Sequence, residues 1–250
     1  QLIQRIISVG KSVGVVAVDP TSPFTGGALL GDRVRMNHYI WDDNVFIRSM
    51  GSHGDLGGLA RKAQDVGDVL AASGKDVVIF ETVGVGQGEL DVAKAVDLTI
   101  VVLVPESGDE VQLMKAGLVE IADIFVVNKS DRQGADRLAQ SLKSILHSIT
   151  KKDHLEPPIY NTSADRNEGI SELYKGLTDL TEVMVNKGLM NQKYLDRHRN
   201  RVLNLIQDQL LGKFWTQQRL DQLEDSVHNL SMTDESPYKV AKTLLDSANE

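Results

Sequence analysis

The stretch Ile124-Phe-Val-Val-Asn-Lys-Ser-Asp131 joins four apolar residues to a short polar turn. The apolar run has the length and β-branched content of a buried strand, so the polar residues begin at its carboxyl end. The two carboxylate oxygens of Asp131 can accept the ring N–H and the exocyclic amine of guanine together, a charge-assisted pair that adenine cannot form. Lys129 would lay its alkyl stem along the purine, and Asn128 would tie this loop to neighbouring backbone. The stretch predicts a guanine-binding loop, with a solvated turn as the alternative.

Apolar runs of this kind alternate with segments of helical periodicity along most of the chain. The expected strands lie at residues 13–18, 45–47, 76–80, 98–104, 124–127 and 158–160, and the expected helices at 58–73, 89–95, 110–121, 131–149 and 168–186. This alternation predicts an α/β fold with a mostly parallel sheet flanked by helices. Such sheets bind ligands in the crevice at the carboxyl ends of their strands.

The last part of the chain is charged and helical in pattern, and no further strand is expected there. We predict a domain over residues 1–186 and a helical arm over 187–250, broken near 231–237. The arm carries an apolar stripe, with three arginines outside it; the stripe consists of Leu195, Val202, Leu205, Ile206, Leu210 and Leu211, and the arginines are Arg197, Arg199 and Arg201. An apolar stripe does not show which surface covers it, so packing on the arm's own domain and dimerisation both remain open.

Composition excludes several classes of protein. The 250 residues include 27 basic and 35 acidic side chains, a net charge of −8, which argues against a broad nucleic-acid or anionic-membrane surface. The absence of cysteine excludes disulfides, zinc–thiolate sites and thiol catalysis, and it fits a reducing, cytoplasmic location. The longest apolar runs have the length of strands rather than of membrane helices, and nothing at the amino end resembles a signal peptide.

Carboxylates at two other expected strand ends indicate a magnesium site. Glu81 follows the strand at 76–80, and Gly84 comes three residues later, a spacing that lets the acid meet Mg²⁺ and the glycine N–H approach a γ-phosphate. Asp19 ends the strand at 13–18, and Asp32 follows on a glycine-rich loop. Together with Glu81 they offer three hard oxygen ligands, as Mg²⁺ shared with phosphates requires. Aspartates that merely cap loops are the alternative.

Taken together, these clusters resemble the MeaB/ArgK family of P-loop GTPases. The matching strings are Val18-Asp-Pro-Thr-Ser-Pro23, Leu30-Gly-Asp32, Leu56-Gly-Gly58, Glu81-Thr-Val-Gly-Val-Gly-Gln87 and Asn128-Lys-Ser-Asp131. Members are chaperones of the adenosylcobalamin enzyme methylmalonyl-CoA mutase and were formerly described as arginine/ornithine transport kinases. The resemblance therefore implies a P-loop NTPase-type sheet, GTP/GDP and Mg²⁺ as cofactors, the mutase as partner, and a homodimer formed through the helical arm.

The resemblance also implies roles for individual residues. The metal ligands would be Asp19, Asp32 and Glu81, and the residues of the hydrolytic switches Asp32, Glu81, Gly84 and Lys115. Ser163 and Ala164 match the loop whose backbone N–H contacts the guanine oxygen. We thus expect a chaperone that hydrolyses GTP and gates cobalamin delivery to the mutase and its protection.

One family motif, the Walker A phosphate loop, is not found in residues 1–250. Gly10-Lys11-Ser12 matches the last three residues of the motif, but the motif needs glycine where Arg5 stands and a helix where a strand is expected. We expect the phosphate loop and a central strand before it to lie outside these residues, leaving a truncated chain with an incomplete phosphate site and no GTPase activity of its own.

Three other functions remain open. A catalytically dead dimeric scaffold is consistent with the missing phosphate loop. A nickel- or cobalt-insertion GTPase would share the fold, although the lack of cysteine and the scattered six histidines argue against it. A lysine-arginine-ornithine transport-associated kinase is the third, and no residue specifically supports it.

Overall fold

The computed structural model describes residues 1–20, 36–39, 41–52, 58–82, 93–105, 118–149, 155–228 and 236–247. They divide into two compact units, Gln1–Asn191 and Gln192–Glu250, which we call the sheet unit and the helical unit. The division falls five residues after the predicted boundary between residues 186 and 187.

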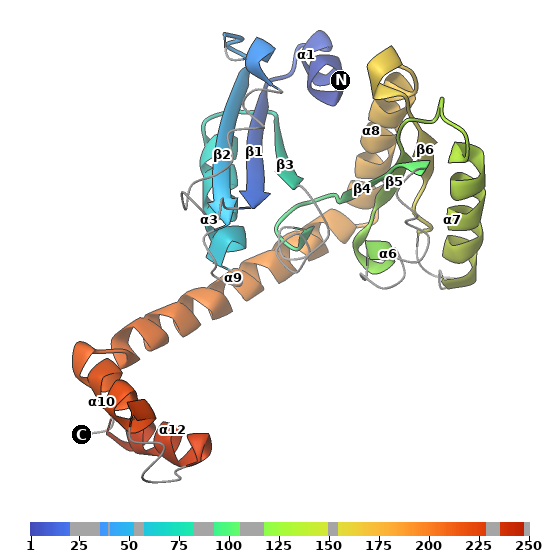
Figure 1. Cartoon of the computed structure of the whole chain (residues 1–250). Helices are drawn as coiled ribbons and strands as arrows, with labels where there is room; N and C mark the ends of the chain where they lie inside the picture. Colours follow the sequence, from blue (N-terminus) through green and yellow to red (C-terminus); the bar gives the residue numbers. More distant parts are fainter. Residues whose placement is uncertain are drawn as a thin grey trace. The chain divides into compact units, whose positions relative to one another are not determined.

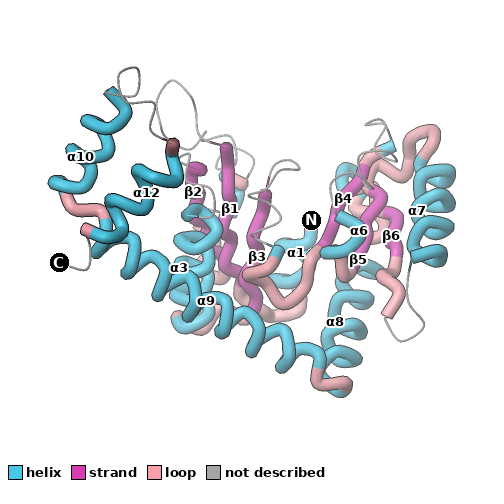
Figure 2. Tube along the Cα trace, turned by 90° about the horizontal axis from the view of Figure 1, so that it is seen from below, coloured by secondary structure: helices cyan, strands magenta, loops and turns pink. Residues whose placement is uncertain are grey.

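Within the described residues, six strands form the framework of the sheet unit, and each runs parallel to its neighbours in its own sheet (Figure 1). They are β1 Val13–Pro20, β2 Val45–Ser52, β3 Val77–Thr82, β4 Ile100–Leu103, β5 Ile124–Val127 and β6 Ile159–Asn161. Each overlaps a predicted strand, and the predicted α/β class with parallel strands flanked by helices is confirmed. The strands belong to two three-stranded sheets, ordered β2-β1-β3 and β4-β5-β6, rather than to one. Figure 2 shows β3 and β4 as the strands of the two sheets that lie nearest each other.

The described helices of the sheet unit are α1 Leu2–Ser8, α3 Gly58–Ala72, α6 Leu118–Ile121, α7 Ala135–Ile149 and α8 Ile170–Asn186, with short 3-10 turns at η1 Asn37–Tyr39 and η3 Ala164–Arg166. Along the chain, α1 precedes the first strand of the sheet unit, α8 follows the last one, and the other helices lie between strands. Most of the predicted helix at 89–95 and residues 110–117 of the next one lie outside the described residues.

The first sheet is covered on both faces because successive side chains of β1 point to opposite sides. Val16 and Val18 pack against Ala63 and Leu70 of α3. Val13 and Val15, whose side chains point to the other face of β1, form a second cluster with Ile6 of α1. The central strand β1 therefore holds α1 and α3 on opposite faces.

The second sheet has the same construction around β5, whose four residues are all buried. Phe125 and Val127 pack with Leu142 and other leucines of α7. Ile124 and Val126 pack with Leu173 of α8. This core fixes the carboxyl end of β5, where the predicted guanine-binding loop begins.

The helical unit contains most of α9 Leu189–Phe214 together with α10 Gln217–His228 and α12 Pro237–Asp246. Arg219 of α10 joins these helices: its guanidinium donates to the carbonyls of Phe214 (2.6 Å) and Ser247 (3.3 Å). Ser236 caps α12 by accepting the N–H of Lys239, and a proline follows in the first turn. The predicted break near 231–237 lies largely outside the described residues. Within the described ranges, no helix is both long and apolar enough to cross a membrane.

Candidate functional site

The loop after β5 is anchored to both neighbouring strands. The N–H of Asn128 donates to the carbonyl of Leu103 at the end of β4 (2.8 Å), and the N–H of Ser130 donates to the carbonyl of Thr162 just after β6 (2.9 Å). Between them, Lys129 takes a left-handed conformation with φ 56°, which turns the chain sharply. The backbone of the loop is thus held at the carboxyl edge of the second sheet.

The side chain of Asn128 joins this loop to the one after β6. Its Oδ1 accepts a hydrogen bond from the hydroxyl of Thr162 (3.1 Å) and another from the N–H of Ala164 (3.2 Å). Thr162 is 2% exposed, so its hydroxyl is shielded from water and the bond to Asn128 satisfies it. Asn128 therefore braces the two loops against each other.

The carboxylate of Asp131 is held by the same second loop. The hydroxyl of the buried Ser163 donates to Oδ1 (2.8 Å), and the guanidinium of Arg166 lies 3.2 Å from Oδ2. The hydrogen bond from Ser163 is the largest cause that lowers the pKa of Asp131 below its ordinary value, and the charge of Arg166 acts in the same direction. Asp131 thus remains ionised and fixed in orientation, as a bidentate acceptor must be.

The second loop is itself rigidly folded. Ser163 and Glu168 exchange two backbone hydrogen bonds of 3.1 Å, which close the turn that contains η3. Asn167 (φ 57°) and Gly169 (φ 73°) take left-handed conformations as the chain enters α8. The donors of Ser163 and Ala164 are therefore presented from a closed turn.

The first sheet places the backbone of Asp19 and Glu81 near its carboxyl edge. In the register of the parallel pairs, Glu81 lies opposite Ala17, two residues before Asp19. Oε2 of Glu81 is a buried carboxylate oxygen. Asp32, Gly84 and Lys115 lie outside the described residues, so the structure does not bear on their predicted roles. Among the described side chains, no group of three or more His, Cys, Asp or Glu is placed to hold a metal ion.

Gly10-Lys11-Ser12 has a structural setting different from that of a phosphate loop. The N–H and the hydroxyl of Ser12 both donate to Oδ2 of Asp76 (2.8 Å each), which ties the starts of β1 and β3 together. A strand, β1, begins at the next residue.

The structure brings four predicted residues into one hydrogen-bonded network: Asn128, Asp131, Ser163 and Ala164. Lys129 lies in the same loop. The sequence interpretation missed Thr162 and Arg166. Thr162 could have been found from its place between β6 and Ser163, whereas Arg166 follows no recognisable spacing.

Comparison with known proteins gives consistent results for the sequence. A family model described as "Methylmalonyl Co-A mutase-associated GTPase MeaB" matches residues 1–219. A putative GTPase of Pyrococcus abyssi is 42% identical over 248 residues, which are 98% of this chain and 76% of the relative. The GTPase ArgK of Escherichia coli is 39% identical over 191 residues, 75% of this chain and 58% of the relative.

The fold also matches a solved structure. The crystal structure of a LAO/AO transport system kinase superposes with a TM-score of 0.68 at 25% identity and covers all of this chain and 76% of the other.

Proposed function

The chain belongs to the MeaB family of methylmalonyl Co-A mutase-associated GTPases, and we propose that the network around Asp131 binds the guanine base of GTP and GDP. The observation that carries this proposal is the pair of contacts to the two oxygens of Asp131, one from Ser163 and one from Arg166. They hold an ionised carboxylate at a sheet edge, and this supports the proposal because a purine with two donors needs such an acceptor.

Binding of guanine would redistribute contacts that the structure already contains. The ring N–H and exocyclic amine would take the outward side of the Asp131 carboxylate, so the half-exposed Arg166 would give up its contact with Oδ2. The N–H of Ala164, which donates to Asn128, would turn to the guanine oxygen. The Ser163 hydroxyl would remain on Oδ1, because it is buried behind the carboxylate. The base is thus recognised by groups that are largely pre-positioned.

Asp19, Asp32 and Glu81 are the residues we assign to Mg²⁺. The buried carboxylate oxygen of Glu81 near the end of β3 fits a hard cation, and Asp19 is the last residue but one of the neighbouring strand β1. Bound Mg²⁺ would neutralise charge on the phosphate oxygens. Glu81 and Asp19 would hold and orient it, while Gly84 and Lys115 belong to segments that respond to the nucleotide.

The biological role we propose follows the family description. The nucleotide state would gate delivery of the cobalamin cofactor to methylmalonyl-CoA mutase and its protection there, with GTP hydrolysis as the timing step. The helical unit would join two copies, because its apolar stripe is exposed: Leu205, for example, is 51% exposed and Leu210 63%.

The proposal that Asp131 binds guanine can be tested by comparing how a variant and the parent chain bind different nucleotides. The Asp131→Asn variant should bind GDP about ten- to a hundredfold more weakly than the parent chain, because a charge-assisted pair is lost. It should gain affinity for xanthosine diphosphate, because the exocyclic oxygen that replaces the amine of guanine can accept a hydrogen bond from the amide N–H. Binding would be followed by NMR titration up to millimolar nucleotide, with ADP as a reference.

A matched control is Asp179→Asn, which removes an exposed carboxylate of α8 paired with Lys175 and leaves the site unchanged. Equal affinity of the parent chain and the Asp131 variant for both nucleotides would refute the assignment and favour a scaffold with a dead site.

A further inference from the structure

The two groups that contact the carboxylate of Asp131 differ in burial. Ser163, whose hydroxyl donates to Oδ1, is 2% exposed, whereas the side chain of Arg166 is 59% exposed. The side chain of Asp131 lies between these values at 22%. Ser163 therefore contacts the carboxylate from within the protein, and Arg166 contacts it from the side of the solvent. A ligand that enters from solvent would meet Arg166 at the carboxylate.

The guanidinium of Arg166 resembles the edge of guanine that Asp131 would accept. It is planar and carries N–H donors on neighbouring nitrogens, as the ring N–H and the exocyclic amine of guanine are also carried on neighbouring nitrogens in one plane. The structure places Nη2 of Arg166 3.2 Å from Oδ2 of Asp131. Guanine and Arg166 therefore compete for the same acceptor.

The contact of Arg166 is weak enough for guanine to replace it. Ion pairs between exposed side chains contribute little, because water screens the charges and ordering a long side chain costs entropy. Guanine would instead offer two donors to the two oxygens of Asp131, and a bidentate charge-assisted pair is stronger. The base can thus displace Arg166, and its affinity is then reduced by the strength of the ion pair.

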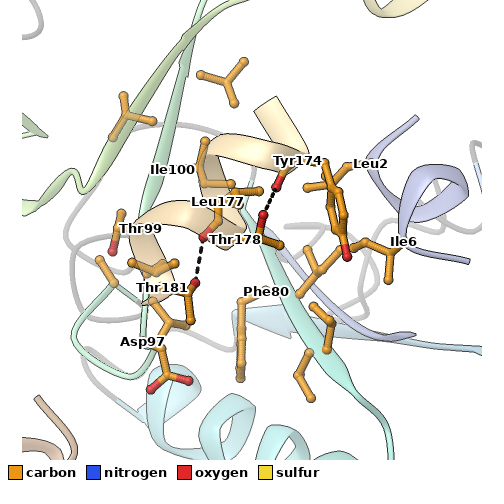
Figure 3. Close-up of a pocket in the computed structure, with 18 of the residues that line it drawn as sticks. Leu2, Ile6, Phe80, Asp97, Thr99, Ile100, Tyr174, Leu177, Thr178 and Thr181 are labelled. Carbon is orange, nitrogen blue, oxygen red and sulfur yellow. Dashed lines mark hydrogen bonds between the residues drawn. The ribbon is translucent and has the colours of Figure 1, made fainter. Parts of the chain in front are cut away.

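The backbone that carries Arg166 is fixed, so its side chain is the part that can move aside. The N–H of Arg166 donates to the carbonyl of Ser163 (3.1 Å) inside the closed turn. The turn leads into α8, where Leu177 lines a cavity of the sheet unit and the hydroxyls of Thr178 and Thr181 donate to carbonyls of their own helix, at 3.2 Å and 2.7 Å (Figure 3). Release of the ion pair therefore needs only a rotation of the Arg166 side chain.

Asp131 does not depend on Arg166 for its charge. The hydrogen bond from Ser163 is the largest cause that lowers the pKa of Asp131, and Arg132 acts in the same direction as Arg166. Loss of the Arg166 guanidinium therefore leaves an ionised acceptor that is still held by Ser163.

We propose that Arg166 is an internal competitor for guanine, which occupies the Asp131 carboxylate while the site is empty and leaves it when the base enters. Arg166 thereby weakens binding of the base and favours release of the nucleotide, whereas Ser163 holds the carboxylate in both states. This inference rests on the proposed function, because it takes guanine as the ligand that Asp131 accepts.

The proposal can be tested with guanosine, which is uncharged, so that a change of charge on the chain cannot act on it through phosphates. Arg166→Gln should bind guanosine about two- to fivefold more tightly than the parent chain, the factor that an exposed ion pair contributes. Arg166→Lys keeps the charge and should stay close to the parent chain. Affinities would be read by ligand-observed NMR on the 250-residue chain, with adenosine as the reference ligand.

A matched control and a change of salt make the test specific to the ion pair. Arg199→Gln removes another exposed arginine that is paired with an aspartate, Asp196 of α9, and should bind guanosine like the parent chain. At about 1 M salt the Debye length falls to about 3 Å, close to the length of the Arg166 ion pair. The affinity of the parent chain should then approach that of Arg166→Gln.

The possible outcomes separate this inference from the function on which it rests. If Arg166→Gln binds guanosine as tightly as the parent chain does, or more weakly, Arg166 is not a competitor and the guanine site still stands. If none of these chains binds guanosine, or if adenosine binds equally well, the proposed function is wrong and the competitor role is overturned with it.

Discussion

Individual residues of the candidate site differed in how well sequence could predict them. Asn128, Lys129 and Asp131 stand next to each other, and their chemistry alone indicates a guanine-binding loop. Ser163 was assigned only by family resemblance, because the pairing of its hydroxyl with Asp131 joins loops 32 residues apart. The contact of Arg166 with the same carboxylate had no sequence signal, since it depends on the closed turn between Ser163 and Glu168.

The Ser163 contact leads to a prediction about pH. Ser163→Ala should raise the pKa of Asp131 toward its ordinary value, because the largest cause of the lowered pKa is removed. A carboxyl whose pKa is lowered by folding stabilises the folded state above the ordinary Asp range, and this contribution is lost as pH falls through the folded pKa. In the variant this contribution should therefore be smaller, and its loss should be complete at a higher pH. Carbon-detected NMR titration of the Asp131 carboxyl measures its pKa in the parent chain and in the variant.

The control for this prediction is Ser148→Ala, which removes a hydroxyl that bonds only within α7. An Asp131 titration curve that is the same in the parent chain and the Ser163 variant would contradict the assigned cause.

At the scale of elements, the six described strands were predictable because each contains a short apolar run, although β2 continues past its predicted end at residue 47 through Arg48 to Ser52. The division into two sheets could not be predicted, since edge and interior strands have the same composition here. The sequence therefore does not show which neighbouring strands are left without hydrogen bonds to each other. The helix α1 was not among the predicted helices. The turn into α8 was also missed, although Gly169 marks it with a φ of 73°.

Gly169 supports a prediction about local stability. A Cβ at this position would collide with the carbonyl oxygen of Asn161, in addition to the strain of a left-handed conformation. Gly188 has nearly the same conformation, φ 71°, with nothing near the added atom. Gly188→Ala should therefore cost about 1–2 kcal/mol, the price of the conformation alone, and Gly169→Ala clearly more. Urea unfolding of both variants gives the difference, and equal losses would show that the close approach to Asn161 is relieved cheaply.

At the scale of the whole molecule, the chain consists of a sheet unit that contains the candidate site and a helical unit with few buried apolar side chains. In the helical unit Leu244 of α12 is buried, whereas the large apolar residues of α9 from Tyr194 to Leu211 are exposed. Sequence predicted the stripe on α9 but not its partner, because amphipathicity shows that a face is to be covered without showing by what.

Exposure of the stripe on α9 predicts that the chain associates with itself. Leu210→Glu introduces a charge at a 63% exposed position, so α9 should remain helical while the contact between copies is lost. Asn204→Asp, an exposed change on the side of the same helix opposite Val202 and Ile206, adds the same charge and should leave association unaltered. Sedimentation velocity over a range of concentrations should show dimers for the parent chain and the control but monomers for the Leu210 variant. A parent chain that stays monomeric at every concentration would contradict a role of α9 in dimerisation. Its apolar face would then have to be covered by a surface other than a second copy of the chain.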